Sequence, residues 1–240
     1  MSPNLHKTSK SRRTGPAAFV ADQERPLRGL FVHRMGENAA DEQRVAEFWI
    51  AHGLNAMALE DPRQRYSRLP DLQLLRDGAP WAYCEVKTLW QHSWTVRILH
   101  EDRPIEERRE MSTKPADERI GGDLVTAMRQ LQAGNPGHVL HNFVVLVNRE
   151  PMMTPAFLTE LLTRPVAVSG RSLAARRAAQ FAREFQAFRR DVDLCLLAKP
   201  RTGGKLVIES CILFNPGLRS FAEEISGLRG DKLVSVEPAA

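Results

Sequence analysis

The sequence predicts an α/β protein with one main domain, in which helices cover a β-sheet. Apolar residues recur at helical spacing in residues 38–52 and again in residues 117–133. Short apolar or alternating runs, typical of strands, occupy residues 54–59, 69–75, 81–89 and 141–148. Because the order is helix, three strands, helix, strand, a layered arrangement of helices on a sheet is favoured over an all-helical or all-β fold.

Composition narrows the class of protein further. The chain has 240 residues, is 42% hydrophobic and carries a net charge of +5. It contains no apolar run of the roughly 20 residues that a membrane span needs, and its first residues do not resemble a secretory signal. The three cysteines, Cys84, Cys195 and Cys211, lack metal-ligand spacing and fit strand cores in a reducing compartment. We therefore expect a cytoplasmic protein without a membrane partner.

The first helical pattern carries a candidate functional carboxylate. Residues 29–33 are expected to form a short strand before it, and Asp41 to cap its first turn. The apolar stripe of this helix includes Val45, Ala46 and Trp49, which lie three, four and seven residues after Glu42. We therefore expect Glu42 on the inward face, with Glu47 as the reserve candidate. The alternative is that Glu42 is a first-turn glutamate favoured by the helix dipole.

A pair of strands joined by a turn forms the centre of the prediction. Residues 69–75 and 81–89 are the strands, and residues 76–80 carry the turn signals. Glu85 and Lys87 are two apart and so point to one face of the second strand. Asp71, just after Pro70 on the first strand, is placed to face them. Two carboxylates beside an ammonium predict a site for a hard cation.

The segment Pro70-Asp71, followed after a gap by Glu85-Val86-Lys87, resembles the PD-(D/E)xK nuclease superfamily. The resemblance implies a restriction-endonuclease-like core, αβββαβ, with a mixed central sheet flanked by helices. It implies that Asp71, Glu85 and the Val86 carbonyl bind Mg²⁺, for which Mn²⁺ can substitute. Lys87 would orient the attacking water or help to deprotonate it, and a helix carboxylate such as Glu42 would hold a metal-bound water or a second ion.

The helix over residues 117–133 provides a further candidate, Gln130. It flanks the apolar stripe, and a glutamine on the helix after the Glu-x-Lys strand recurs in several branches of the superfamily. The resemblance implies a supporting or substrate contact for Gln130. The alternative is ordinary helix surface. The domain is predicted to span residues 29–215, with its nuclease-like core at 38–148, after a basic and disordered tail at 1–28.

Beyond the core we expect helices at residues 155–163 and 172–190, a hairpin of residues 193–199 and 205–214, and a short helix with a tail in residues 216–240. The charged connection between residues 90 and 116 is expected to be a lid, a binding loop or disordered. Arginines near the motif and on the second of these helices are candidate phosphate contacts, although both groups could be simple solvated surface: Arg63, Arg65, Arg68, Arg176, Arg177 and Arg183.

These observations predict a Mg²⁺-dependent endonuclease that acts on nucleic acid, with DNA favoured over RNA although the sequence does not separate the two. One alternative is a nucleic-acid-binding module on the same scaffold without catalysis. Another is an unrelated α/β protein with a buried Asp-Lys-Glu cluster. The sequence leaves a homodimer, the cleavage specificity and the biological role open.

Overall fold

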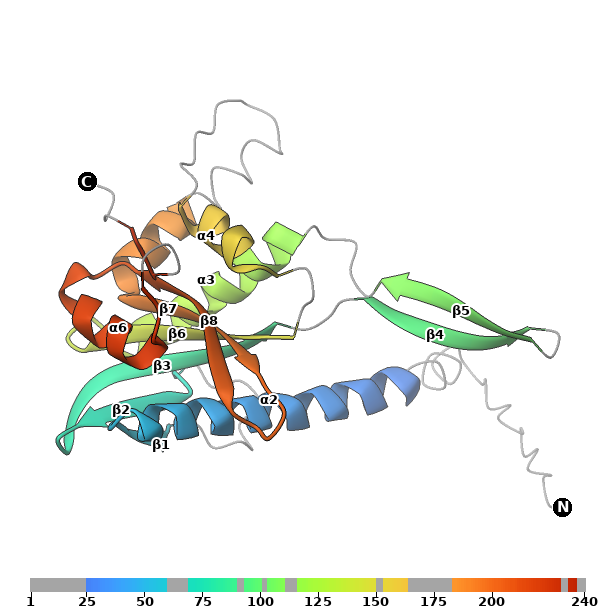
Figure 1. Ribbon diagram of the computed structural model, residues 1–240, viewed down its shortest axis with the longest axis horizontal. Helices are drawn as coiled ribbons and strands as arrows, with labels where there is room; N and C mark the ends of the chain where they lie inside the picture. Colours follow the sequence, from blue (N-terminus) through green and yellow to red (C-terminus); the bar gives the residue numbers. More distant parts are fainter. Residues whose placement is uncertain are drawn as a thin grey trace, which may run out of the picture. The chain divides into compact units, whose positions relative to one another are not determined.

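The computed structural model describes residues 25–59, 69–89, 93–100, 103–110, 116–149, 153–163, 183–229 and 233–236. The chain divides into two compact units, Met1–Asn38 and Ala39–Ala240. The second unit holds the β-sheet and its covering helices (Figure 1). It is an α/β unit in which helices flank a seven-stranded mixed sheet.

The elements follow the predicted order through the core. The described helices and strands are α2 (Arg25–Ala51), β1 (Asn55–Ala58), β2 (Leu72–Arg76), β3 (Ala79–Leu89), β4 (Ser93–His100), β5 (Arg103–Glu110), α3 (Ala116–Gly134), β6 (His141–Asn148), α4 (Pro155–Thr163), β7 (Leu194–Pro200), β8 (Leu206–Leu213), the 3₁₀ turn η1 (Pro216–Leu218), α6 (Arg219–Ser226) and β9 (Leu233–Ser235). Residues 183–191 are also helical.

The sheet has the strand order β1-β2-β3-β6-β7-β8-β9. β3, β6 and β7 run parallel, whereas β1-β2, β2-β3 and β7-β8 are antiparallel pairs. The parallel centre explains the apolar run at residues 141–148, because a strand covered on both faces excludes polar side chains. β6 is buried along nearly its whole length.

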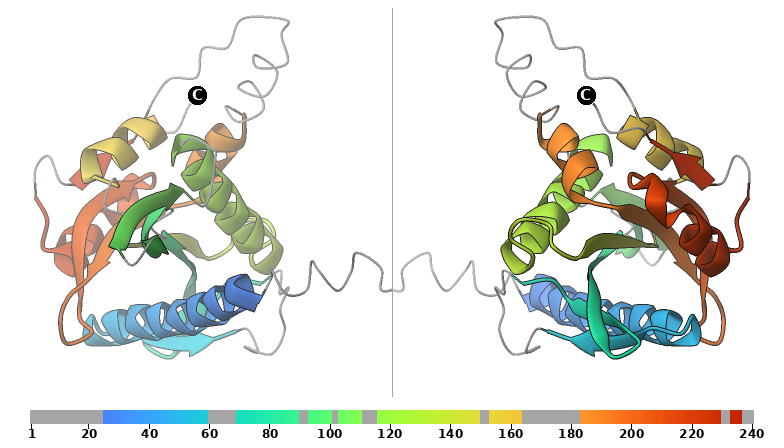
Figure 2. Two further views of the ribbon diagram at one scale, coloured as in Figure 1. Left: turned by 90° about the vertical axis from the view of Figure 1, so that its right-hand side faces the viewer. Right: turned by 90° about the vertical axis from the view of Figure 1, so that its left-hand side faces the viewer.

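Two apolar layers cover opposite faces of the sheet. Val45 and Trp49 of α2 pack with Cys84 and Val86 on one face, which α6 also covers. α3, α4 and residues 183–191 cover the other face, where Leu89 and Leu146 lie. Figure 2 shows residues 39–51 of α2 and the helix α3 on opposite sides of the sheet. Successive residues of β3 therefore contact different helices.

The structure corrects three expectations near the N-terminus. Residues 29–33 belong to α2 and form no strand, and residues 25–28 of the predicted tail are helical too. Asp41 lies inside α2 and so is not its cap. The connection at residues 90–116 contains the hairpin β4-β5, a separate two-stranded sheet, which is compatible with the expected lid or binding loop.

Most of the other predictions for the fold are confirmed. The strands at 54–59, 69–75, 81–89 and 141–148 and the helices at 117–133 and 155–163 occur within a few residues of their predicted bounds. β7 and β8 form the predicted hairpin. β9 was expected to be tail. All three cysteines are buried in strands.

Candidate active site

The candidate site lies where β2 and β3 separate. β2 begins at Leu72, which is paired with Cys84 of β3. β3 continues to Leu89, so its last residues extend past the start of β2 and remain paired with β6 on the other side. Asp71 directly precedes β2 and therefore lies at the point of divergence. Main-chain groups of β3 that face away from β6 are available there to side chains.

Two hydrogen bonds connect Asp71 with the Glu85-Val86 segment of β3. The main-chain N–H of Asp71 donates to Oε2 of Glu85 at 3.2 Å, and the main-chain N–H of Val86 donates to Oδ2 of Asp71 at 2.7 Å. Each carboxylate thus binds the backbone that carries the other. Since the N–H and C=O of one strand residue point to the same side, the Val86 carbonyl also faces the side on which Asp71 lies. The predicted proximity of Asp71 to Glu85 agrees with this geometry.

Lys87 lies beside the Glu85 carboxylate on the same face of β3. Its Nζ donates to Oε1 of Glu85 and, at 2.7 Å, to Oε1 of Gln130. The Glu85 side chain is fully buried, whereas the Lys87 side chain is 21% exposed, so the ammonium lies between the buried carboxylate and solvent. Burial alone would lower the pKa of Lys87, but the negative charge of Glu85, with smaller contributions from Asp71 and Asp123, raises it.

The C-terminal part of α3 positions this group from one side. Gln130 accepts from Lys87 and donates through Nε2 to the main-chain oxygen of Leu69 at 3.3 Å, so it connects β3 to the segment that leads into Asp71. Gly134 lies against Pro70: a Cβ there would be 2.4 Å from the Pro70 Cδ. Only a residue without a side chain allows α3 to approach Pro70 so closely. Gln130 therefore contacts Lys87 at the site, which is one of the two placements that the sequence left open.

The helix α2 presents a different carboxylate to the core from the one expected. Asp41, with Val45 and Trp49, forms the fully buried row of α2, whereas Glu42 is half-buried and Glu47 is exposed. The spacing of four between these buried residues was the sequence signal for Asp41. The expectation that Asp41 caps the helix conflicts with this spacing, which places Asp41 on the buried face. The expected inward orientation of Glu42 is thus only partly realised, and its catalytic role stays a prediction.

Asp41 contacts the other face of β3. It accepts from Thr88 Oγ1 at 3.0 Å, and the Arg149 guanidinium donates to both of its oxygens at 2.9 Å. Arg44 also pairs with it. Thr88 follows Lys87 directly, and the two side chains point to opposite faces of the strand. Asp41 and Arg149 therefore connect α2 to the ends of β3 and β6, on the face of the sheet opposite to Lys87.

The predicted phosphate contacts are only partly covered by the structure. Arg63, Arg65, Arg68, Arg176 and Arg177 lie outside the described residues, as do residues 1–24 of the basic tail. Arg183 is exposed at the start of the helical segment 183–191. Phe185 and Phe188 of the same segment are buried, as the spacing of the phenylalanines predicts.

The donor set suits a small hard cation. In the part of the chain that the structure describes, no group of three or more His, Cys, Asp or Glu is arranged to hold a metal ion. Mg²⁺, however, uses one or two carboxylates and completes its shell with waters and substrate phosphate oxygens. Asp71 and Glu85 supply two carboxylates, and the Val86 carbonyl is a third hard oxygen. A carboxylate has about four lone-pair directions, so it can accept hydrogen bonds and also bind a cation.

No protein-family model matches this chain, and neither do curated proteins or solved structures. Among the described helices, none is both long and apolar enough to cross a membrane. The case for a function therefore depends on the geometry of the site alone.

Proposed function

We propose that this chain is a Mg²⁺-dependent phosphodiesterase that cleaves nucleic acid internally, DNA in preference to RNA, on a restriction-endonuclease-like core. One observation carries the proposal: at the divergence of two strands, Asp71 donates its main-chain N–H to Glu85 and accepts from the main-chain N–H of Val86, and the Lys87 ammonium pairs with Glu85. A buried carboxylate beside a lysine adds little net stability compared with apolar packing. A catalytic use gives these three residues a reason to lie together.

The roles follow from the position of each group. Asp71, Glu85 and the Val86 carbonyl would hold Mg²⁺, which supplies Lewis-acid stabilisation of the phosphate and a more acidic bound water. Lys87 lies next to Glu85 and is partly exposed, so its ammonium can orient a water and stabilise charge on the phosphate in the transition state. Gln130 fixes the Lys87 side chain through a 2.7 Å hydrogen bond and thereby limits where the charge lies.

The order of elements supports the same assignment. The helix α2, the strands β1 to β3, the helix α3 and the strand β6 follow the αβββαβ pattern, with the β4-β5 hairpin as an addition between β3 and α3. Asp71 directly precedes the second strand of that core, and Glu85 lies on the third. The agreement of residue types with their place in the sheet is more informative than the short motif alone.

The test compares matched variants of the full chain. Plasmid, single-stranded DNA and tRNA are each incubated with Mg²⁺, Mn²⁺ or a chelator. Asp71→Asn and Lys87→Met should lower metal-dependent cleavage by about a hundredfold or more, the scale of a lost positioned electrostatic group. Asp77→Asn and Lys205→Met alter an exposed carboxylate and an exposed lysine at turns and should leave cleavage unchanged. All four variants should unfold cooperatively, which separates loss of chemistry from loss of fold.

Equal cleavage by the wild type and by the Asp71 and Lys87 variants would identify a contaminating nuclease and remove the proposal. If no substrate is cut with either metal, although the wild type binds nucleic acid, the chain is a binding module. Comparison of plasmid with tRNA tests the preference for DNA over RNA.

A further inference from the structure

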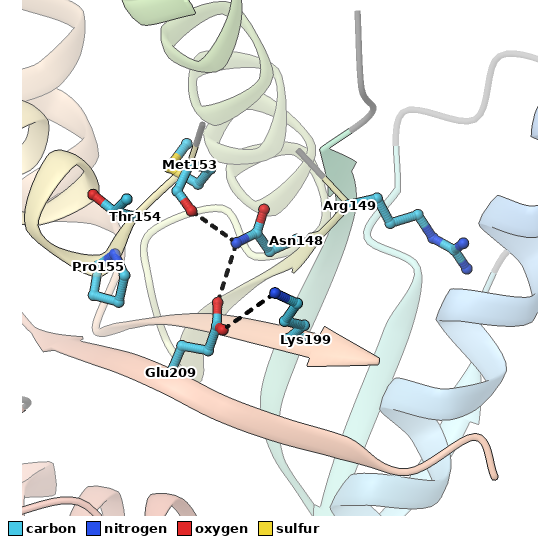
Figure 3. A pocket seen from close by; sticks show the side chains of 7 residues that line it. All are labelled: Asn148, Arg149, Met153, Thr154, Pro155, Lys199 and Glu209. Carbon is cyan, nitrogen blue, oxygen red and sulfur yellow. Dashed lines mark hydrogen bonds and ion pairs between the residues drawn. The ribbon is translucent and has the colours of Figure 1, made fainter. Parts of the chain in front are cut away.

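A cavity of about 340 Å³ lies next to the candidate site, at the carboxyl ends of the parallel strands β6 and β7 (Figure 3). Open α/β sheets bind ligands in this position, and the volume is in the range of small-molecule sites. It is lined by Asn148, Arg149, Met153, Thr154, Pro155, Lys199 and Glu209. Nothing in the proposed metal chemistry uses this cavity.

Glu209 reaches the cavity because β8 contains a bulge. Leu197 of β7 pairs with Ser210, but the next residue, Ala198, pairs with Ile208, so Glu209 is the extra residue. Bulges of this kind redirect a side chain and are common next to functional sites. Ser210 and Ile208 can therefore point to opposite faces while Glu209 extends toward Asn148. A regular strand would not place this carboxylate there.

The polar groups of the cavity are hydrogen-bonding groups with little net charge. Asn148 is buried and its Nδ2 donates to Glu209 Oε2 at 3.1 Å and to the main-chain oxygen of Met153 at 3.0 Å. Lys199 Nζ lies 4.0 Å from Glu209 Oε1 and balances its charge. In Figure 3 the Arg149 guanidinium points away from these groups, and it is paired with Asp41. The cavity is therefore unsuited to a phosphate group and suited to a neutral polar ligand.

The cavity is about one nucleotide away from the candidate site. Lys87 is in register with Leu146, and Leu89 with Asn148, so Asn148 lies two residues farther along and one strand across. With a rise of about 3.3 Å per residue and about 4.8 Å between strands, the Cα atoms of Lys87 and Asn148 are roughly 8 Å apart. The residues share the face of the sheet that α3 and α4 cover. A nucleotide with its phosphate at Lys87 can place its base in the cavity.

We propose that this cavity binds one guanine base of the nucleic acid next to the cleaved phosphate, an inference that rests on the proposed function. Guanine presents a ring N–H and an amino group side by side, which match the two acceptor oxygens of Glu209. Its adjacent carbonyl oxygen matches the Lys199 ammonium. Met153 and Pro155 supply apolar surface for the ring faces. Uracil has a single ring N–H between two carbonyl oxygens, and these oxygens would face the Glu209 carboxylate unfavourably.

The experiment measures binding of guanosine and uridine 5′-monophosphates to the full chain by titration calorimetry, in chelator so that no cleavage occurs. We expect guanosine monophosphate to bind at least about tenfold more tightly than uridine monophosphate, the scale of one hydrogen bond to a charged group. Glu209→Gln replaces an acceptor oxygen by a donor and should abolish that preference. The control Glu224→Gln alters an exposed glutamate of α6 and should retain it.

Asp71→Asn should retain the preference even though cleavage is lost, which separates the two proposals. Guanosine binding that depends on Glu209 in a protein without nuclease activity would support the cavity assignment and reject the proposed function. The cavity assignment is overturned if the wild type binds the two nucleotides equally or not at all, or if Glu209→Gln leaves the preference intact.

Discussion

Substitution of Gly134 by alanine tests how α3 positions the metal-binding segment. A Cβ at residue 134 would lie 2.4 Å from Cδ and 2.7 Å from Cγ of Pro70. Carbon atoms in contact are about 3.5–4.0 Å apart, so α3 or Pro70 must move by about 1 Å. The proline ring has no flexible end to give way. Overpacking of this kind costs about 1–3 kcal/mol, and the gain in helix propensity recovers at most about 1 kcal/mol. We expect Gly134→Ala to lower the free energy of unfolding by roughly 0.5–2 kcal/mol.

Gly122 is the matched control, because it lies in the same helix and a Cβ there meets nothing within 4 Å. Gly122→Ala should raise the free energy of unfolding by about 0.5–1 kcal/mol through helix propensity alone. Urea unfolding followed by circular dichroism measures both values. A Gly134→Ala protein as stable as Gly122→Ala would refute the contact. Since Pro70 precedes Asp71, Gly134→Ala should also reduce metal-dependent cleavage, whereas Gly122→Ala should not.

Two further predictions concern buried charge. Burial alone would raise the pKa of Asp193, but hydrogen bonds from His141, the Asn142 backbone, His138 and Asn215 outweigh it and hold the pKa well below its ordinary value. The folded state therefore binds fewer protons than the unfolded state at acid pH. The resulting stability is present above the unfolded-state pKa of about 3.9 and is lost as pH falls through the folded-state pKa. In urea titrations between pH 6 and 2, Asp193→Asn should be less stable than the wild type at pH 6 and should lose less stability on acidification. If both proteins show the same dependence of unfolding free energy on pH, the prediction is wrong. Arg149→Met leaves Asp41 buried without its main counter-charge and should lower the free energy of unfolding by about 3–5 kcal/mol. The double variant Arg149→Met, Asp41→Asn should recover part of this loss. Equal stability of the single and double variants would contradict the pairing.

The central strands could be predicted because their patterns have one physical interpretation. Residues 143–147 are apolar on both faces and rich in valine, which favours a short covered strand, and β6 includes them. The helix α3 shows its apolar stripe at helical spacing between a polar start and the Gly134-Asn135-Pro136-Gly137 stop. Strand pairing across a tight turn likewise placed Asp71 near Glu85 and Lys87.

The missed elements have patterns that local sequence leaves ambiguous. Residues 29–33 are a short apolar run, which a helix and a strand accommodate equally well, and they continue α2. In the β4-β5 hairpin, charged residues are opposite each other, as with Arg97 and Glu106. Along the sequence, charged residues at this density look like a solvated connection.

By itself, the sequence determined the layered α/β order and the grouping of two carboxylates and a lysine around one pair of strands, because these follow from periodicities of 2 and 3.6 residues and from the tight turn between the strands. Only the tertiary structure decided that Asp41 is the buried carboxylate of α2, since neighbouring helix positions differ by 100° and packing alone selects one. It also brought Gln130 to Lys87 from a different element. The direction of Glu209 depends on a bulge, which arises from the pairing of two strands and has no signature in one strand alone.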